Sequence, residues 1–238
     1  MDVAEARKTW IQTYTPHKVC SSVENWHVLM TDAEIKSCLL DLAAKLNKQF
    51  ENNKVMCVVL LKGAFVFASD FARAVNFPCT FHFVRAKSYG SGASQTEQAT
   101  DVTIQLAGDV TIDSEVDTIL LLDELFDSGK TLASVARYYK ETMGFSKDRI
   151  FTCTLFAKEH HSPFPAPTFA GISDLPELWL AGYGLDLDGY ARGWPHLMVR
   201  ITEDDCAKEE GATFEERQLA RLDAIRVTVR SRIQQISM

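Results

Sequence analysis

The segment from Val116 to Thr131 constrains the fold more than any other part of this 238-residue chain. Residues 118–122 (Thr-Ile-Leu-Leu-Leu) form an apolar run, which is typical of a strand buried on both faces of a parallel sheet. Two acids, Asp123 and Glu124, follow where such a strand would end. The sequence Asp-Ser-Gly-Lys-Thr at 127–131 then opens an apolar periodicity that predicts a helix. The segment therefore predicts a strand, a short turn and a helix in succession.

A turn of this kind is suited to binding an anion. The first N–H groups of a helix have no partner within the helix, and the helix dipole adds partial positive charge there. Gly129 permits close approach of the backbone, and the Ser and Thr hydroxyls of the segment can add hydrogen bonds. Asp123 and Glu124 would repel a bare phosphate, so we expect them to hold sugar hydroxyls or a Mg²⁺ ion. The first glycine of a Walker A loop is missing, and a plain turn capped by Asp127 is the alternative interpretation.

The composition is that of an ordinary globular protein, with 46% apolar and 24% charged residues. We expect a single domain over residues 1–238, and the net charge of −7 disfavours a nucleic-acid-binding surface. Six scattered cysteines and no secretory leader predict a reducing compartment, so the cytoplasm is the expected location. No apolar stretch is long enough to span a bilayer. The tail Ile236 to Met238 is a poor match to a peroxisomal signal, which makes a peroxisome-like organelle the alternative location.

Strands and helices alternate along the rest of the chain. We expect an irregular N-terminal arm over 1–30 and a helix capped by Thr31 and Glu34. Thr213 and Glu216 form a second capping box, and the amphipathic helix that it starts, within 207–238, is expected to pack on the domain or on a second subunit. A further helix is expected over 64–75, and strands are expected at 55–61, 79–86, 118–122, 150–157 and 178–183. Residues 101–106 and 109–112 suggest edge strands or a hairpin, and 90–100 a mobile loop. The alternation predicts an α/β fold with a parallel-sheet core and helices on both faces, in which ligands bind at the carboxyl ends of the strands.

Four stretches occur in the order found in hypoxanthine-guanine-type phosphoribosyltransferases. Residues 61–64 (Leu-Lys-Gly-Ala) resemble the pyrophosphate loop of that family, and 87–89 (Lys-Ser-Tyr) resemble the start of its flexible lid. Residues 123–131 resemble its signature for 5-phosphoribosyl 1-pyrophosphate (PRPP), with the order of the two acids swapped and Ser128 in place of the commoner Thr. The fourth stretch runs from Lys158 to Arg192. The resemblance covers 55–201 and implies the type I phosphoribosyltransferase fold, with a small hood formed by the N- and C-terminal segments.

The resemblance also implies a role for each matching residue. The implied PRPP ligands are Lys62, Gly63, Ser88, Tyr89, Asp123, Glu124, Asp127, Ser128, Gly129, Lys130, Thr131 and Arg192. The implied purine ligands are Lys158, Trp179, Leu180 and Asp186. Among them Asp127 matches a catalytic base near purine N7, Lys158 the donor to the 6-oxygen, and Trp179 the ring that stacks on the base. Mg²⁺ is the implied cofactor, with Asp123, Glu124 and Asp186 as candidate metal ligands, and the Leu–Lys peptide bond at 61–62 is expected to be cis.

The implied activity is transfer of the 5-phosphoribosyl group from PRPP to a 6-oxopurine in purine salvage. The implied assembly is a homodimer or homotetramer that binds neither nucleic acid nor a membrane. Leu178 stands where the purine enzymes have a lysine, so the preference among hypoxanthine, guanine and xanthine stays open. One alternative is a regulatory protein of the same fold that senses PRPP or nucleotides and binds nucleic acid. Another is a receiver-like phosphoacceptor domain, in which the acids and the lysine would come from separate strands.

Overall fold

Among the described residues, the main sheet has six strands in the order β4-β3-β2-β5-β6-β7. The computed structural model describes residues 2–15, 23–88, 102–107, 115–159 and 163–236. The strands are β2 (Val55–Leu61), β3 (Cys79–Ser88), β4 (Val102–Leu106), β5 (Thr118–Phe126), β6 (Ile150–Lys158) and β7 (Phe169–Leu175). All neighbouring pairs are parallel except β3 with β4, which is antiparallel at the edge. The expected parallel core is confirmed, with one antiparallel edge strand added.

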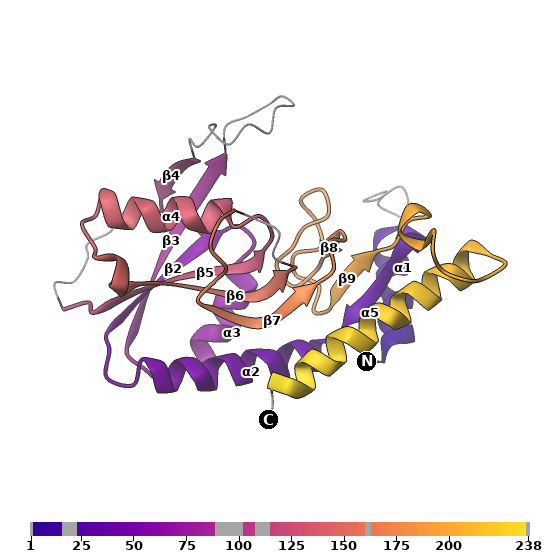
Figure 1. Cartoon of the computed structure of the whole chain (residues 1–238), viewed down its shortest axis with the longest axis horizontal. Coiled ribbons are helices and arrows are strands. Elements are labelled where there is room, and N and C mark those ends of the chain that lie inside the picture. The colour runs from indigo at the N-terminus through magenta and orange to yellow at the C-terminus, as the bar shows by residue number, and fades with distance from the viewer. Residues whose placement is uncertain (1, 16–22, 89–101, 108–114, 160–162, 237–238) are drawn as a thin grey trace.

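Helices cover both faces of this sheet (Figure 1). On one face, α2 (Asp32–Gln49) and α3 (Phe65–Ala74) pack on a core that includes Leu120 and Leu122 of β5. On the other face, α4 (Lys130–Glu141) packs on a core that includes Ile119 and Leu121. Successive side chains of a strand point to opposite faces, so an uninterrupted apolar run is what a strand covered on both sides requires.

A second, antiparallel sheet has the order β1-β9-β8 and joins distant parts of the chain. Its strands are β1 (Trp26–Met30), β8 (Leu180–Ala181) and β9 (Leu197–Arg200). The N-terminal helix α1 (Val3–Tyr14) packs on this sheet through an aromatic cluster of Trp10, Trp26 and Trp194. Short 3₁₀ helices occur at Val23–Asn25, Lys147–Arg149 and Asp204–Cys206.

The expectation of an irregular N-terminal arm is wrong. Asp2 caps α1 by accepting a hydrogen bond of 2.8 Å from the Glu5 N–H, and Ala6 and Trp10 are fully buried. Five apolar residues of this helix pack in one cluster and recur at helical spacing, so the sequence did contain a helix signal: Val3, Ala6, Trp10, Ile11 and Tyr14. Strands β1, β7 and β9 were also not predicted, and the strand expected at 178–183 is reduced to β8. The expected edge strand at 109–112 and the loop at 90–100 lie outside the described residues.

The C-terminal helix α5 (Phe214–Ile236) lies beside α2 and β7 (Figure 1). Thr213 and Glu216 form the expected capping box, with reciprocal hydrogen bonds of 3.0 and 3.2 Å. Leu222, Ile225 and Val229 are buried against the main core. No helix in the described part of the chain is long and apolar enough to cross a membrane.

Candidate active site

The two acids of the central segment lie inside β5 rather than after it. The expected end of this strand at Leu122 is wrong, because β5 continues to Phe126 and pairs with β6 to that point. Asp123 lines a pocket of about 150 Å³, together with residues 125–129, 131 and 132. Glu124 is only 9% exposed, and its carboxylate lies against the loop that follows β2. The longer strand therefore buries Glu124 and leaves Asp123 half-buried beside the pocket.

Burial of these neighbouring carboxyl groups makes their ionisation unfavourable. Burial, followed by repulsion from Glu124, raises the pKa of Asp123 well above its ordinary value. Burial also raises the pKa of Glu124; hydrogen bonding and the Arg192 charge oppose this rise, whereas the Asp186 charge adds to it. Glu124 Oε2 has no hydrogen-bond partner within the described residues. Such an arrangement is relieved by a cation or by hydroxyl donors.

The loop after β2 closely approaches the carboxylate of Glu124 at Gly63. A Cβ atom at Gly63 would lie 1.5 Å from Glu124 Oε1. The Leu61–Lys62 peptide bond is cis, as expected from the resemblance. Gly184, with φ +99°, lies on the other side, where a Cβ would be 2.3 Å from the Gly63 carbonyl oxygen. Segments that follow β2 and β8 thus meet at the end of β5.

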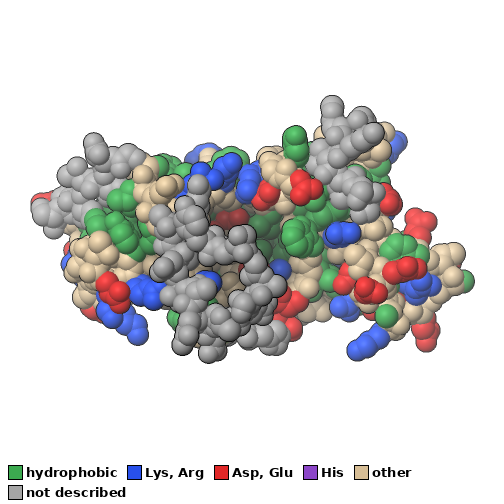
Figure 2. Space-filling model, turned by 90° about the horizontal axis from the view of Figure 1, so that it is seen from above, with side chains coloured by type: hydrophobic (Ala, Val, Ile, Leu, Met, Phe, Trp, Pro, Cys, Tyr) green, Lys and Arg blue, Asp and Glu red, His purple; other side chains and the backbone are tan. Residues whose placement is uncertain are grey.

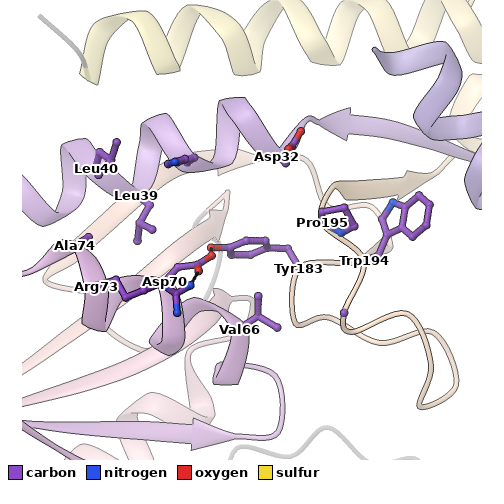
Figure 3. A pocket seen from close by; sticks show the side chains of 12 residues that line it. Asp32, Leu39, Leu40, Val66, Asp70, Arg73, Ala74, Tyr183, Trp194 and Pro195 are labelled. Atoms are coloured by element: carbon purple, nitrogen blue, oxygen red, sulfur yellow. Dashed lines mark hydrogen bonds and ion pairs between the residues drawn. The ribbon is translucent and has the colours of Figure 1, made fainter. Parts of the chain in front are cut away.

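The segment after β8 is attached to α3 by a partly buried hydrogen bond. Tyr183 donates its hydroxyl proton to Asp70 Oδ2 at 2.6 Å (Figure 3), and burial raises the pKa of Tyr183. These two side chains help line a pocket of about 560 Å³ between α2, α3 and this segment. Asp70 also pairs with Arg73 on the next turn of α3. The hydrogen bond holds Gly184 next to the Gly63 loop.

Arg192 and Asp186 lie together in the same segment. Arg192 donates to Asp186 Oδ1 at 2.6 Å and to the Gly184 carbonyl at 2.8 Å. The second oxygen of Asp186 accepts the Gly189 N–H at 2.8 Å. Both charges act on Glu124, which places them at the same end of the sheet. Within the described residues no three His, Cys, Asp or Glu side chains converge, so Asp123, Glu124 and Asp186 do not form a ready-made metal cage.

The N-terminus of α4 has the geometry expected of an anion site. Gly129 precedes the helix with φ +74° and provides no side-chain cap, so the alternative of a turn capped by Asp127 is wrong. A Cβ at Gly129 would lie 2.6 Å from the Phe126 ring. Lys130 and Thr131 form the first turn of α4, and the Lys130 N–H lies 3.5 Å from Ser128 Oγ. The helix dipole and the backbone N–H groups therefore point toward the pocket that Asp123 lines.

Lys158 lies at the end of β6 and connects two acids. Its Nζ is 2.9 Å from Asp127 Oδ1 and 3.8 Å from Glu177 Oε2, and its side chain is 12% exposed. The candidate catalytic base, Asp127, therefore forms an ion pair with the lysine that is expected to bind the purine, Lys158. Glu177 was not expected from the sequence, although it lies only two residues before Trp179.

The remaining candidate residues are Trp179, Leu180, Lys62, Ser88 and Tyr89. Trp179 is 65% exposed, and its carbonyl accepts the Arg200 N–H at 2.9 Å. Backbone groups alternate along an antiparallel strand, so the N–H and C=O of Leu180 point away from β9. Lys62 is exposed. Ser88 ends β3 opposite Val102, and Tyr89 lies outside the described residues.

Comparisons with known proteins show the family of the chain. The family model described as a phosphoribosyl transferase domain matches residues 31–186. The hypoxanthine phosphoribosyltransferase of Salmonella typhimurium is 30% identical over 174 residues, which cover 71% of this chain and 90% of that protein. The hypoxanthine-guanine phosphoribosyltransferase of Aquifex aeolicus is 29% identical and covers 72% and 93%.

Solved structures show the same fold. The hypoxanthine phosphoribosyltransferase of Trypanosoma cruzi superposes with a TM-score of 0.63 at 22% identity, over 75% of this chain and 96% of that one. A hypoxanthine-guanine phosphoribosyltransferase from Bacillus anthracis gives a TM-score of 0.59 at 22% identity and covers 73% and 97%. Because the family model matches residues 31–186, more than half of the chain, and a relative is 30% identical over most of its length, the chain belongs to the phosphoribosyl transferase family and has its type I fold.

Proposed function

We propose that the protein transfers the 5-phosphoribosyl group from PRPP to a 6-oxopurine and so forms a nucleoside 5′-monophosphate and pyrophosphate in purine salvage. The observation that carries the proposal is the 2.9 Å pair of Lys158 Nζ and Asp127 Oδ1 beside the N-terminus of α4. A pair of side chains that can recognise a purine thus lies beside an anion site. The curated relatives are named for hypoxanthine and guanine, which agrees with this class of substrate.

The Lys158–Asp127 pair matches one edge of a 6-oxopurine. The 6-oxygen accepts a hydrogen bond, and N7 next to it carries a proton in one tautomer of the free base. Lys158 would donate to the 6-oxygen, and Asp127 would accept the N7 proton. Adenine carries an amino donor at position 6, which faces an ammonium group without an acceptor, so it should be rejected. The exposed Trp179 ring offers a face for stacking, and the backbone of Leu180 would contact the edge near C2.

The PRPP end of the site uses charge and backbone groups. Residues 128–131 would hold the 5′-phosphate at the N-terminus of α4, and Asp123 and Glu124 would accept hydrogen bonds from the ribose hydroxyls. Lys62, Gly63 and Arg192 would bind the pyrophosphate, and Ser88 and Tyr89 would cover it. Purine N9 then forms a bond to C1 of the ribose as the bond from C1 to the pyrophosphate oxygen breaks. The carboxylates stabilise the positive charge that develops on the ribose ring.

The donors present fit a magnesium ion. Asp123 and Glu124 supply hard oxygen ligands whose burial is otherwise unfavourable, and Glu124 Oε2 is without a partner among the described atoms. Asp186 would contribute through water. Bound Mg²⁺ would neutralise charge on the leaving pyrophosphate.

A panel assay tests the proposal. Hypoxanthine, guanine, xanthine and adenine are incubated with PRPP and Mg²⁺, and nucleotide formation is followed by absorbance. We expect transfer to 6-oxopurines and none to adenine; absence of transfer to all four bases contradicts the proposal. The panel also ranks xanthine against hypoxanthine, a preference on which Leu178 bears. Lys158→Ala should weaken use of the 6-oxopurine while calorimetry still detects PRPP binding.

The regulatory alternative requires a basic face. Four arginines of α5 pair with acids of other segments, and the face in Figure 2 carries acidic and basic side chains side by side. We infer that the protein acts on small molecules, as a homodimer or homotetramer in the cytoplasm.

A further inference from the structure

Beside the candidate base pocket, β7 has two residues, Ser173 and Asp174, where its partner β6 has one, Ala157. Phe156 lies opposite Ile172, but Lys158 lies opposite Leu175, so the register shifts by one residue. Ser173 and Asp174 are both exposed at this point, whereas the residues on either side of them are buried. Asp174 has φ +60°, a left-handed conformation that is uncommon for residues other than glycine. These features define a β-bulge, a structure that redirects the chain that follows it.

The C-terminal helix contacts both sides of this bulge. Arg232 Nη2 lies 3.1 Å from Asp174 Oδ2. Leu178, beyond the bulge, lines a pocket of about 510 Å³ together with Ile225 and Val229 of α5. Helix α5 starts at residue 214, outside the residues 31–186 that match the family model. The contact is therefore made by a segment of this chain that the family match does not include.

The bulge sets the position of the residues assigned to the purine. Leu175 accepts the Glu159 N–H at 3.0 Å and lies opposite Lys158, so the register after the bulge aligns the end of β6. Glu177, which lies 3.8 Å from Lys158, and then Trp179 follow directly. Without the extra residue, each side chain after it would turn to the other face of the strand.

We propose that the Asp174–Arg232 ion pair is a positioning device for the base pocket: Arg232 stabilises the bulge in β7 and thereby holds Lys158, Glu177 and Trp179 in place. This inference rests on the proposed function. Arg232 does not touch the substrate and acts through Asp174. The C-terminal helix is thus coupled to recognition of the purine and not to binding of PRPP.

A purely structural role for the pair predicts a different result. Both side chains are nearly half exposed, at 46% and 44%, and such ion pairs contribute little to folding. Buried residues of α5, including Leu222 and Val229, hold the helix on the core instead. Loss of Arg232 should therefore change substrate recognition with little effect on thermal stability.

The experiment measures KM for hypoxanthine at saturating PRPP, KM for PRPP at saturating hypoxanthine, kcat and Tm. We expect Arg232→Gln and Asp174→Asn each to raise the purine KM by about two- to fivefold, with KM for PRPP and Tm unchanged. Asn tolerates the left-handed conformation, so that variant removes the charge alone. The double variant should be no worse than either single one, and Arg232→Lys should restore most of the affinity. Arg230→Gln is the matched control, because Arg230 lies on the same helix and pairs with Glu34 of α2 instead.

Three results would overturn the positioning role. These are an unchanged purine KM in Arg232→Gln, an equal rise in both KM values, and an equal effect of Arg230→Gln. A double variant whose purine KM is the product of the two single effects would also exclude coupling through the pair. If the unaltered protein transfers no phosphoribosyl group to any purine, both this inference and the proposed function fail. Normal transfer with an unmoved KM removes only the role of Arg232.

Discussion

The end of β5 and the C-terminal helix α5 differ in how their charged side chains are paired. At the end of β5, Asp123 and Glu124 are adjacent, and repulsion between them adds to the effect of burial in raising the pKa of Asp123. On α5, four arginines each lie within 4 Å of a carboxylate from another segment. These pairs are Arg217–Glu203, Arg221–Glu209, Arg230–Glu34 and Arg232–Asp174. The fold therefore pairs four of the five arginines of α5, with the buried Arg226 as the exception among the described residues, whereas it leaves both acids of β5 for a ligand to balance.

The largest expected effect concerns Asp127, which adjoins the β5 acids. Asp127→Asn keeps the shape of the side chain but cannot take a proton, so kcat should fall by about 10²- to 10⁴-fold. Steady-state kinetics would measure kcat, and calorimetry should find PRPP binding little changed. Asp148→Asn, at the amino end of β6, is the control. An effect on affinity alone would remove Asp127 from the role of base.

His27 is a buried group whose charged form is a cation, in contrast to the acids of β5. Burial and the charge of Arg7 lower the pKa of this fully buried histidine to about 4. The unfolded chain binds this proton near pH 6.5, so stability is lost as the pH falls from 6.5 toward 4, by about 3 kcal/mol in total. Urea unfolding across this range measures the loss. A His27→Gln variant with the same pH slope would show that another group is responsible.

The contribution of Asp123 and Glu124 to stability should change with pH in the opposite direction to that of His27. Because folding raises the pKa of Asp123 and Glu124, their stability contribution is complete below the unfolded pKa and is lost as the pH rises through the folded pKa. Asp123→Asn and Glu124→Gln should therefore raise the Tm of the ligand-free protein near pH 8 by a few degrees while abolishing most transfer. Calorimetric scans at pH 5 and pH 8 test this. A lower Tm at pH 8 would show that the carboxylates are already compensated within the fold.

The smallest expected effect is on α5. Arg230→Gln removes an exposed pair with Glu34, so the free energy of unfolding should fall by less than about 1 kcal/mol. The difference should shrink further in 1 M NaCl, which screens exposed charges to about 3 Å. A loss several times larger than this would erase the contrast between the two regions.

Local patterns in the sequence predicted much of the core. The apolar run before Asp123, the capping boxes at Thr31 and Thr213, and the glycine before Lys130 all appear where expected, because each depends on residues close in sequence. The N-terminal helix has apolar residues at helical spacing, but the cluster that buries them is completed by Trp26 and Trp194 from other segments, which only the folded chain brings together. The bulge at Asp174 has no local signal, since it is defined by the register with β6.

The sequence by itself determined the strand–turn–helix that forms the anion site and the residues able to carry charge there. Only the tertiary structure decided that Glu124 lies against Gly63, that Lys158 pairs with Asp127 and Glu177, and that Arg232 reaches Asp174. The physical reason is the range of the interactions. Helix capping and strand periodicity act over a few residues, whereas desolvation of carboxylates and strand register depend on segments brought together by the folded core.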